Sequence, residues 1–301
     1  MKILVTGATG FVGSHVLKKL AGKYAADQIV ILSGSSPVGC FQTIPALDYQ
    51  FSSEHLVENG CEDIEVVIHI GAFIPKTSID ADNLIQTTGN ISGTEKLLLA
   101  IDELPHVKKI IYVSTVDVYG IPKGPLSEES LPSPHTLYGW SKLYCEKMVT
   151  SFCLDKGITY EILRLGHVYG EGEEKYRKVI PTMIRNAIND EPICILGSGK
   201  SVRSFIYIED VAEAIVNAIE YVQSDTIVIA GSEAVTINEL AKMIIAYSDS
   251  ASRIEYKASE ETQRDLLFDN RKLMSSLLKS LTPFSIGLKR EIDYMKRLSG
   301  K

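Results

Sequence analysis

A tyrosine and a lysine stand four positions apart, at Tyr138 and Lys142, shortly after Pro134. Proline favours the first turn of a helix, so the sequence predicts a helix that begins here. Residues four apart lie on one face of a helix, and an ammonium group beside a phenol lowers the pKa of that phenol from about 10. Such a pair could move a proton near neutral pH, although an isolated pair of this kind is more often a solvated surface pair.

Thr115 favours the chemical interpretation of this pair. It directly follows an apolar run at residues 109–114, which predicts a buried strand. The carboxyl ends of parallel strands form the ligand-binding edge of a sheet, so the Thr115 hydroxyl would lie where a substrate oxygen binds. We therefore expect Thr115 to hydrogen-bond the oxygen on which Tyr138 acts.

Three glycines, Gly7, Gly10 and Gly13, separate a predicted buried strand at residues 2–6 from a segment with helical spacing of apolar residues. A helix that begins after such a turn presents free amide groups and the positive end of its dipole at one point, which suits a pyrophosphate. Gly7 would allow the tight turn, Gly10 the close approach of a phosphate, and Gly13 the close packing of helix on strand. Because the loop lies between a strand and a helix, it predicts a dinucleotide site.

Predicted strands and helices alternate through about residue 170. This alternation predicts an α/β fold with a doubly wound parallel sheet of the Rossmann type, whose ligands bind at the carboxyl ends of the strands.

The pattern is less regular in the second part of the chain. We expect residues 1–170 to form the NAD(P)-binding domain, rejoined by about residues 203–222, where a predicted strand precedes a helix. Residues 171–202 and 223–301 would form a smaller α/β substrate-binding lobe. The charged segment at residues 171–177 predicts a mobile loop.

Composition excludes several classes of protein. The formal net charge of the 301 residues is −7, without a basic stretch, so we expect no nucleic-acid partner. The five cysteines are odd in number and form no C-x-x-C pair, which is typical of a reducing compartment. The longest apolar run, residues 66–74, is too short to cross a bilayer, and no signal peptide precedes the first strand. We therefore expect no membrane association and a cytoplasmic location.

Several further motifs lie in a fixed order between residue 2 and about residue 272. They occupy residues 6–13, 69–72, 90–94, 114–120, 164–170 and 203–212, and the Y-x-x-x-K pair lies among them at residues 138–142. With these motifs the chain resembles an extended short-chain dehydrogenase/reductase of the nucleotide-sugar epimerase/dehydratase family. The resemblance implies an NAD(P)-dependent enzyme that acts on a nucleoside-diphosphate sugar, and it implies a homodimer.

The resemblance also implies a role for individual residues. Tyr138 would be the catalytic acid/base, Lys142 would also hold the nicotinamide ribose, and Thr115 would orient the sugar oxygen. The implied cofactor-binding residues are Gly7, Gly10, Phe11, Val12, Gly13, Ser33, Asp48, Tyr49, Ala72, Asn90, Tyr138 and Lys142, with Asp48 and Tyr49 against the adenine. The implied substrate-binding residues are Thr115, His167, Arg203 and Arg264, in which the two arginines would clamp the diphosphate.

Three departures from the family pattern bear on the reaction. Ser33 stands where an acid would bind the ribose of NAD, and neither an acid nor an arginine is near it, so NAD and NADP both stay open. His167 replaces the usual asparagine, as in some 4-keto-sugar reductases of the family. Val116 and Asp117 replace the Asp-Glu pair of the 4,6-dehydratases, and valine cannot act as an acid.

Three functions therefore stay open, and the first is an NDP-sugar 4-epimerase. An NDP-4-keto-6-deoxysugar 4-reductase would use the same three residues, Thr115, Tyr138 and Lys142. A catalytically silent NAD(P)-binding sensor or scaffold is the alternative of another class. Silent relatives commonly lose the tyrosine or the lysine, and this chain has both.

Overall fold

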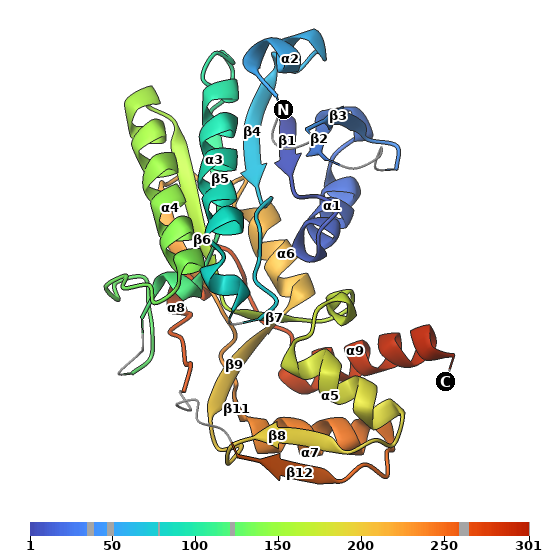
Figure 1. The fold of residues 1–301 in the computed structure, drawn as a ribbon. Coiled ribbons are helices and arrows are strands. Elements are labelled where there is room, and N and C mark those ends of the chain that lie inside the picture. Colours follow the sequence, from blue (N-terminus) through green and yellow to red (C-terminus); the bar gives the residue numbers. More distant parts are fainter. Residues whose placement is uncertain (35–38, 47–50, 78, 121–123, 259–264, 301) are drawn as a thin grey trace.

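The computed structural model describes residues 1–34, 39–46, 51–77, 79–120, 124–258 and 265–300. Its larger part is a seven-stranded sheet in the order β10-β6-β5-β4-β1-β2-β3, with every neighbouring pair parallel (Figure 1). The strands are β1 (Lys2–Thr6), β2 (Ile29–Ser33), β3 (Gln42–Pro45), β4 (Ile64–His69), β5 (Lys109–Thr115), β6 (Thr159–Leu165) and β10 (Asp225–Ile229). The predicted α/β fold with a parallel sheet is confirmed.

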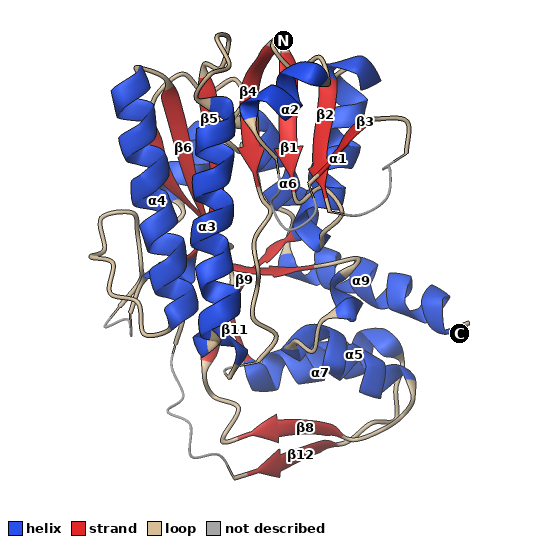
Figure 2. Ribbon diagram, turned by 45° about the horizontal axis from the view of Figure 1, so that its top comes forward, coloured by secondary structure: helices blue, strands red, loops and turns tan. Residues whose placement is uncertain are grey.

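Helices cover both faces of this sheet (Figure 2). Because successive side chains of a strand point to opposite faces, the neighbours Ile3 and Leu4 of β1 belong to two different core clusters. The helices are α1 (Phe11–Lys23) and α6 (Ile208–Asn217) on the face of Ile3, and α2 (Ser53–Glu58), α3 (Leu84–Ile101) and α4 (Leu137–Lys156) on the face of Leu4. A further helix, α8 (Arg271–Ser276), packs against β10 at the edge of the sheet.

The smaller part combines two short sheets with three helices. Its strands pair in the orders β11-β9-β7 and β12-β8. Its elements are β7 (His167–Tyr169), β8 (Ile193–Leu196), β9 (Val202–Tyr207), β11 (Ala234–Thr236), β12 (Ile254–Lys257), α5 (Val179–Ile188), α7 (Ile237–Ser248) and α9 (Phe284–Ser299). Short 3₁₀ helices complete the described chain: η1 (Ala26–Gln28), η3 (Asp80–Asp82), η4 (Val116–Val118) and η5 (Glu173–Lys175).

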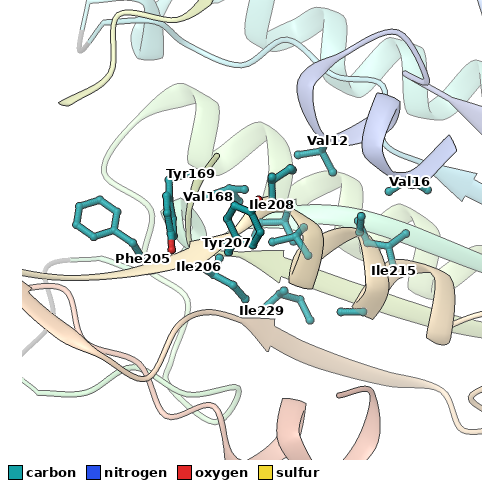
Figure 3. Close-up of a cluster of buried hydrophobic side chains, with 14 of the residues drawn as sticks. Val12, Val16, Val168, Tyr169, Phe205, Ile206, Tyr207, Ile208, Ile215 and Ile229 are labelled. Carbon is teal, nitrogen blue, oxygen red and sulfur yellow. The ribbon is translucent and has the colours of Figure 1, made fainter. Parts of the chain in front are cut away.

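One hydrophobic core joins the two parts (Figure 3). Val12 and Val16 of α1 belong to it together with Ile215 of α6, and so do Tyr169 of β7 and Phe205 of β9. The rings of Tyr169 and Phe205 meet edge to face, with centroids 6.3 Å apart. Burial of this shared apolar surface holds the smaller part against the helix that follows the glycine loop.

The prediction that the strand near residue 204 rejoins the main sheet is wrong. β9 pairs with β7 and β11 in the smaller sheet, and β10, which we expected in the lobe, forms the edge of the main sheet beside β6. The helix α6 that follows β9 does return to the main sheet and packs against α1. Local apolar patterns identify strands but do not select their partners, which explains the difference.

Residues 171–177, expected to be a mobile loop, contain the 3₁₀ helix η5. Glu173 of η5 is buried and forms an ion pair with Lys178 at 3.0 Å. The Tyr207 hydroxyl donates to the Glu171 carboxylate at 2.7 Å. These contacts tie the charged segment to the smaller part, and they could not be read from its composition.

All five cysteines lie in the described residues and are free thiols, and three of them, Cys61, Cys145 and Cys153, are buried. No described helix combines the length and the apolar character needed to cross a lipid bilayer.

Candidate active site

A cavity of about 620 Å³ lies at the carboxyl edge of the main sheet and extends to the smaller part. It is lined by the glycine loop, by the segment that follows β4, by the end of β5, by the first turns of α4, and by β7, β9 and the start of α5. The sequence-predicted residues that line it are Gly7, Gly10, Phe11, Val12, Gly13, Ala72, Thr115, Tyr138, Lys142 and His167. The fold therefore gathers most of the predicted site around one space.

Two of the loop glycines leave no room for a side chain. Gly7 has a φ of +72°, which favours glycine, and a Cβ there would lie 2.5 Å from the amide nitrogen of Gly71. A Cβ on Gly13 would overlap the carbonyl oxygen of Gly7. The loop thus brings α1 against the end of β1, as predicted for Gly7 and Gly13.

The first turn of α1 has free amide groups at the cavity. The helix begins at Phe11, and its N-cap Gly10 offers no side chain that could accept a hydrogen bond. The first amides of a helix have no acceptor within the helix, and Phe11, Val12 and Gly13 all line the cavity. Donors and a positive dipole end at one place fit the diphosphate of a dinucleotide, so these residues fit NAD(P).

Tyr138 and Lys142 lie buried in the first turns of α4, with Thr115 at the end of β5. The helix starts after Thr136, whose hydroxyl accepts a hydrogen bond from the Gly139 amide at 3.1 Å. The Thr115 side chain lies close enough to the Tyr138 phenol to act on its pKa. Lys142 Nζ donates to the carbonyl oxygen of Val113 at 2.8 Å.

The prediction that Lys142 lowers the pKa of Tyr138 is wrong for this arrangement. Burial raises the pKa of Tyr138 above its usual value, the charge of Asp117 raises it further, and the Thr115 side chain opposes them. Burial lowers the pKa of Lys142 to about 8, so this side chain is still mostly charged at pH 7. Burial determines the direction of the Tyr138 pKa shift because a phenolate would lose its hydration in this site. The Lys142 ammonium does not offset that loss, since its Nζ is bound to a carbonyl oxygen.

Asp117 is a polar group of the cavity. Its place in the sequence allows two interpretations, a carboxylate that binds substrate and, the one we favour from sequence, an acceptor of a backbone hydrogen bond in its own loop. Its carboxylate accepts a hydrogen bond from the Thr115 hydroxyl at 3.0 Å and can be reached from the cavity. The side chain is exposed to the cavity, yet the protein atoms that surround this cavity displace bulk water from the carboxylate, and this desolvation raises its pKa. Asp117, Thr115 and Tyr138 thus form one chain of hydrogen bonds and charge interactions.

Comparison with known proteins identifies the family. The sequence model of the NAD dependent epimerase/dehydratase family matches residues 3–230. The chain belongs to this family. It is therefore an NAD-dependent enzyme, as the glycine loop and the residues around Tyr138 suggested.

Similar proteins extend over the whole chain. The chain is 30% identical to the UDP-N-acetyl-alpha-D-glucosaminuronate decarboxylase of Bacillus cytotoxicus, over 99% of this chain and 98% of that protein. It is similar in structure to the UDP-glucuronic acid 4-epimerase of Bacillus cereus in complex with UDP-glucuronic acid and NAD, with a TM-score of 0.86, 29% identity and coverage of 99% and 100%. It is also similar to the UDP-N-acetylglucosamine 4-epimerase of Methanobrevibacter ruminantium M1 in complex with UDP-N-acetylmuramic acid, with a TM-score of 0.85, 26% identity and coverage of 100% and 99%.

Two polar residues from the motifs of this epimerase/dehydratase chain, His69 and Asn90, support the cavity from outside. His69 is buried between the hydroxyls of Thr6 and Thr94, at 2.7 and 3.0 Å. Asn90 does not line the cavity; its side chain accepts from the Phe73 amide at 2.7 Å and donates to the Phe73 carbonyl oxygen at 3.2 Å. Asn90 thus holds the segment after β4, which contains the cavity residue Ala72, and contact with the cofactor stays a prediction.

The predicted substrate residues differ in their position. His167 lines the cavity, and burial lowers its pKa to about 4, with the charges of Arg203 and Lys178 acting in the same direction, so it is neutral at pH 7. Arg203 lies on β9, close enough to act on His167, but it does not line the cavity. Ser33 ends β2 and does not line the cavity either.

Some site residues lie outside the described part of the chain, and others were missed. Asp48, Tyr49 and Arg264 are not among the described residues. The sequence interpretation missed Glu173 and Lys178, which line the cavity as an ion pair. Their charged segment suggested only a surface loop, so no local signal distinguished them.

Proposed function

We propose that the chain is an NAD-dependent 4-epimerase of a nucleoside-diphosphate sugar. The observation that carries this proposal is one cavity shared by the amides at the start of α1 and by Thr115, Tyr138 and Lys142. A dinucleotide site and a proton-transferring phenol at the same carboxyl edge suit the oxidation of an alcohol and the reduction of a ketone. The similar proteins named above support a sugar nucleotide as the substrate.

Each residue would have a distinct task in this reaction. The chemistry that bound NAD supplies is reversible hydride transfer at sugar C4. Tyr138 would act as the phenolate to take the proton of the 4-hydroxyl during oxidation and would return it during reduction of the other face, while Thr115 would hold that oxygen. Burial disfavours the phenolate, so the charge of the neighbouring Lys142 would have to stabilise it in the loaded site. Lys142 would bind the nicotinamide ribose, and the first amides of α1 would bind the diphosphate. The 4-keto sugar must turn over between the two half-reactions while its diphosphate stays bound.

A 4-ketoreductase is the second candidate because His167, found in some reductases of the family, lines the cavity. Incubating the enzyme with UDP-glucose and a trace of NAD distinguishes the epimerase from the reductase. An epimerase converts it to an equilibrium mixture with UDP-galactose without a net change in NADH absorbance. A reductase leaves UDP-glucose unchanged and consumes one NAD(P)H for each 4-keto sugar supplied. A silent binding protein would turn over neither substrate.

Arg203 is expected to act on the substrate and not on the cofactor. An arginine that pairs with a diphosphate forms charge-assisted hydrogen bonds, so Arg203→Ala should weaken UDP binding by roughly 10–10²-fold and leave NAD affinity unchanged. Calorimetric titration with UDP and with NAD measures both effects. Arg253→Ala is the matched control because Arg253 is exposed on the smaller part. Equal UDP affinity in Arg203→Ala and the wild type would place the diphosphate elsewhere.

We also propose a homodimer formed by α3 and α4. These helices lie side by side (Figure 2), and the groove between them exposes large apolar side chains, among them Leu84, Trp140 and Tyr144. Exposed apolar surface of this kind is typical of a protein interface. The combined change Trp140→Glu and Tyr144→Glu should convert a dimer into a monomer in light scattering. Leu196→Glu, at an exposed leucine of β8, should leave the dimer intact; an unchanged mass in the double variant would exclude this interface.

The free thiols and the composition suit a reducing environment. On this basis we propose that the enzyme acts in the cytoplasm.

A further inference from the structure

A buried ion pair lies just outside the active-site cavity, one helical turn along α4 from Lys142. Its partners are Glu146 of α4 and Arg164 of β6, which are 3% and 6% exposed. Arg164 donates from Nε and Nη2 to the two carboxylate oxygens of Glu146, at 3.0 and 2.7 Å. Because residues four apart lie on one face of a helix, Glu146 and Lys142 point to the same side of α4.

The end of β5 holds both of these α4 side chains. Ser114 Oγ of β5 donates to the Glu146 carboxylate at 2.5 Å. The carbonyl oxygen of Val113, the residue before it, accepts from Lys142 Nζ at 2.8 Å. Both side chains are buried, so bulk water screens their charges little. The Glu146 carboxylate is therefore placed to act on the Lys142 ammonium.

Apart from this ion pair, the described titratable groups around Lys142 carry no charge at pH 7. They are His69 of β4, Tyr112 of β5, and Tyr138 and Cys145 of α4. Burial lowers the pKa of the histidine to about 3 and raises the pKa of both tyrosines above the usual value. The Cys145 thiol donates to the carbonyl oxygen of Asn90 at 3.4 Å, so it is protonated in this bond. Among the described groups that act on Lys142, Glu146 is therefore the anion.

We propose that Glu146 is a positioning residue that keeps Lys142 protonated in this buried site. This inference rests on the proposed function, in which the charge of Lys142 holds the ribose and stabilises the phenolate of Tyr138. Burial lowers the pKa of Lys142 to about 8, and the Glu146 carboxylate opposes this fall. Arg164 compensates the buried carboxylate and reaches the Tyr119 hydroxyl with Nη1 at 2.8 Å. It is not among the described groups that act on the charge of Lys142, so it does not cancel the effect of Glu146.

The test measures the titration of Lys142 by NMR of the full-length protein, isotope-labelled at the lysine Cε atoms and freed of NAD. The Lys142 signal is assigned by its loss in Lys142→Met, and the wild type should titrate at a pH of about 8. Glu146→Gln keeps the shape and removes the charge, so the midpoint should fall by about one pH unit or more. Glu146→Asp keeps the charge and changes the shape, so the midpoint should stay near the wild-type value. A purely structural role of Glu146 predicts the reverse order of the two variants.

Further variants separate the carboxylate from its surroundings. Asp155→Asn removes a carboxylate at an exposed position near the end of α4, and Cys145→Ala removes the thiol beside Lys142. Both should keep the wild-type midpoint. If the unpaired Arg164 prevents Glu146→Gln from folding, the combined variant Glu146→Gln and Arg164→Gln removes both charges. The midpoint of Lys142 should fall in this variant as well, because Glu146 and not Arg164 acts on it.

NAD titrations at several pH values connect this effect to the function. Because the charged ammonium would bind the ribose, the NAD affinity of the wild type should decline as the pH rises through about 8, and that of Glu146→Gln about one pH unit lower. An unchanged Lys142 midpoint in folded Glu146→Gln or in the combined variant would overturn the inference, and so would an equal fall in Cys145→Ala. A midpoint that falls while NAD affinity does not follow it would contradict the proposed role of Lys142 and leave the effect of Glu146 in place.

Discussion

Replacing Tyr138 by phenylalanine is expected to lower the turnover of the nucleotide sugar by about 10²–10⁴-fold, the usual contribution of a general acid/base. The phenol is the group that reaches the cavity beside Thr115 and can carry the proton of the sugar oxygen. The ring of phenylalanine fills the same buried space, so the fold and NAD binding should persist. Turnover is measured by product formation, and NAD binding by fluorescence titration.

Tyr256→Phe is the matched control for this change. Tyr256 lies on β12, is exposed, and does not line the active-site cavity. Its loss of a hydroxyl should leave turnover unchanged. Near-normal turnover in Tyr138→Phe would remove Tyr138 from the acid/base role.

Lys142→Met is expected to impair both turnover and cofactor binding. A hydrogen bond to a charged group contributes roughly 1.5–3 kcal/mol, so loss of the bond to the nicotinamide ribose should weaken NAD binding by about 10–10²-fold. Methionine has a similar length and suits the buried position over the ring of Tyr112, where Lys142 Nζ lies 4.3 Å from the ring centroid. Titration with NAD and assays at saturating NAD separate the two effects.

The control for this change is Lys147→Met, on an exposed face of α4. It removes the same charge from the same helix away from the active-site cavity, so NAD affinity should not change. Unchanged NAD affinity in a folded Lys142→Met protein would show that Lys142 does not hold the ribose. Loss of turnover alone would then assign it to the chemical step.

Local pattern accounts for most of the main elements. The run at residues 109–114 predicted β5, which ends one residue later at Thr115 and brings its hydroxyl to the sheet edge. The glycine loop, the strand before it and the helix after it were predicted together, because each glycine meets a steric demand of its own position. The family motifs added the residues around Tyr138 for the same reason: their spacing along one helix is a local property.

Pairing between distant strands was not predictable in the same way. The strand near residue 204, β9, was expected in the main sheet but lies in the smaller three-stranded sheet. β10, which was expected in the lobe, forms the edge of the main sheet instead. An apolar strand can form hydrogen bonds with any exposed strand edge, so the partner depends on which edges remain free when the whole chain has packed. The ion pair of Glu173 and Lys178 at the cavity was unpredictable for the same reason. It depends on β9, α5 and η5, which meet only in the folded chain.

The amino-acid sequence alone was sufficient for the class of fold, the dinucleotide loop and the Thr115, Tyr138 and Lys142 set, since these depend on residue type and short spacing. The tertiary structure decided which charges face the cavity. It brought Asp117 to the hydroxyl of Thr115, turned Asn90 toward Phe73, and raised the pKa of Tyr138 where the sequence predicted that it would fall. The physical reason is that burial and neighbouring charges set a pKa, and both arise from segments that meet only after folding.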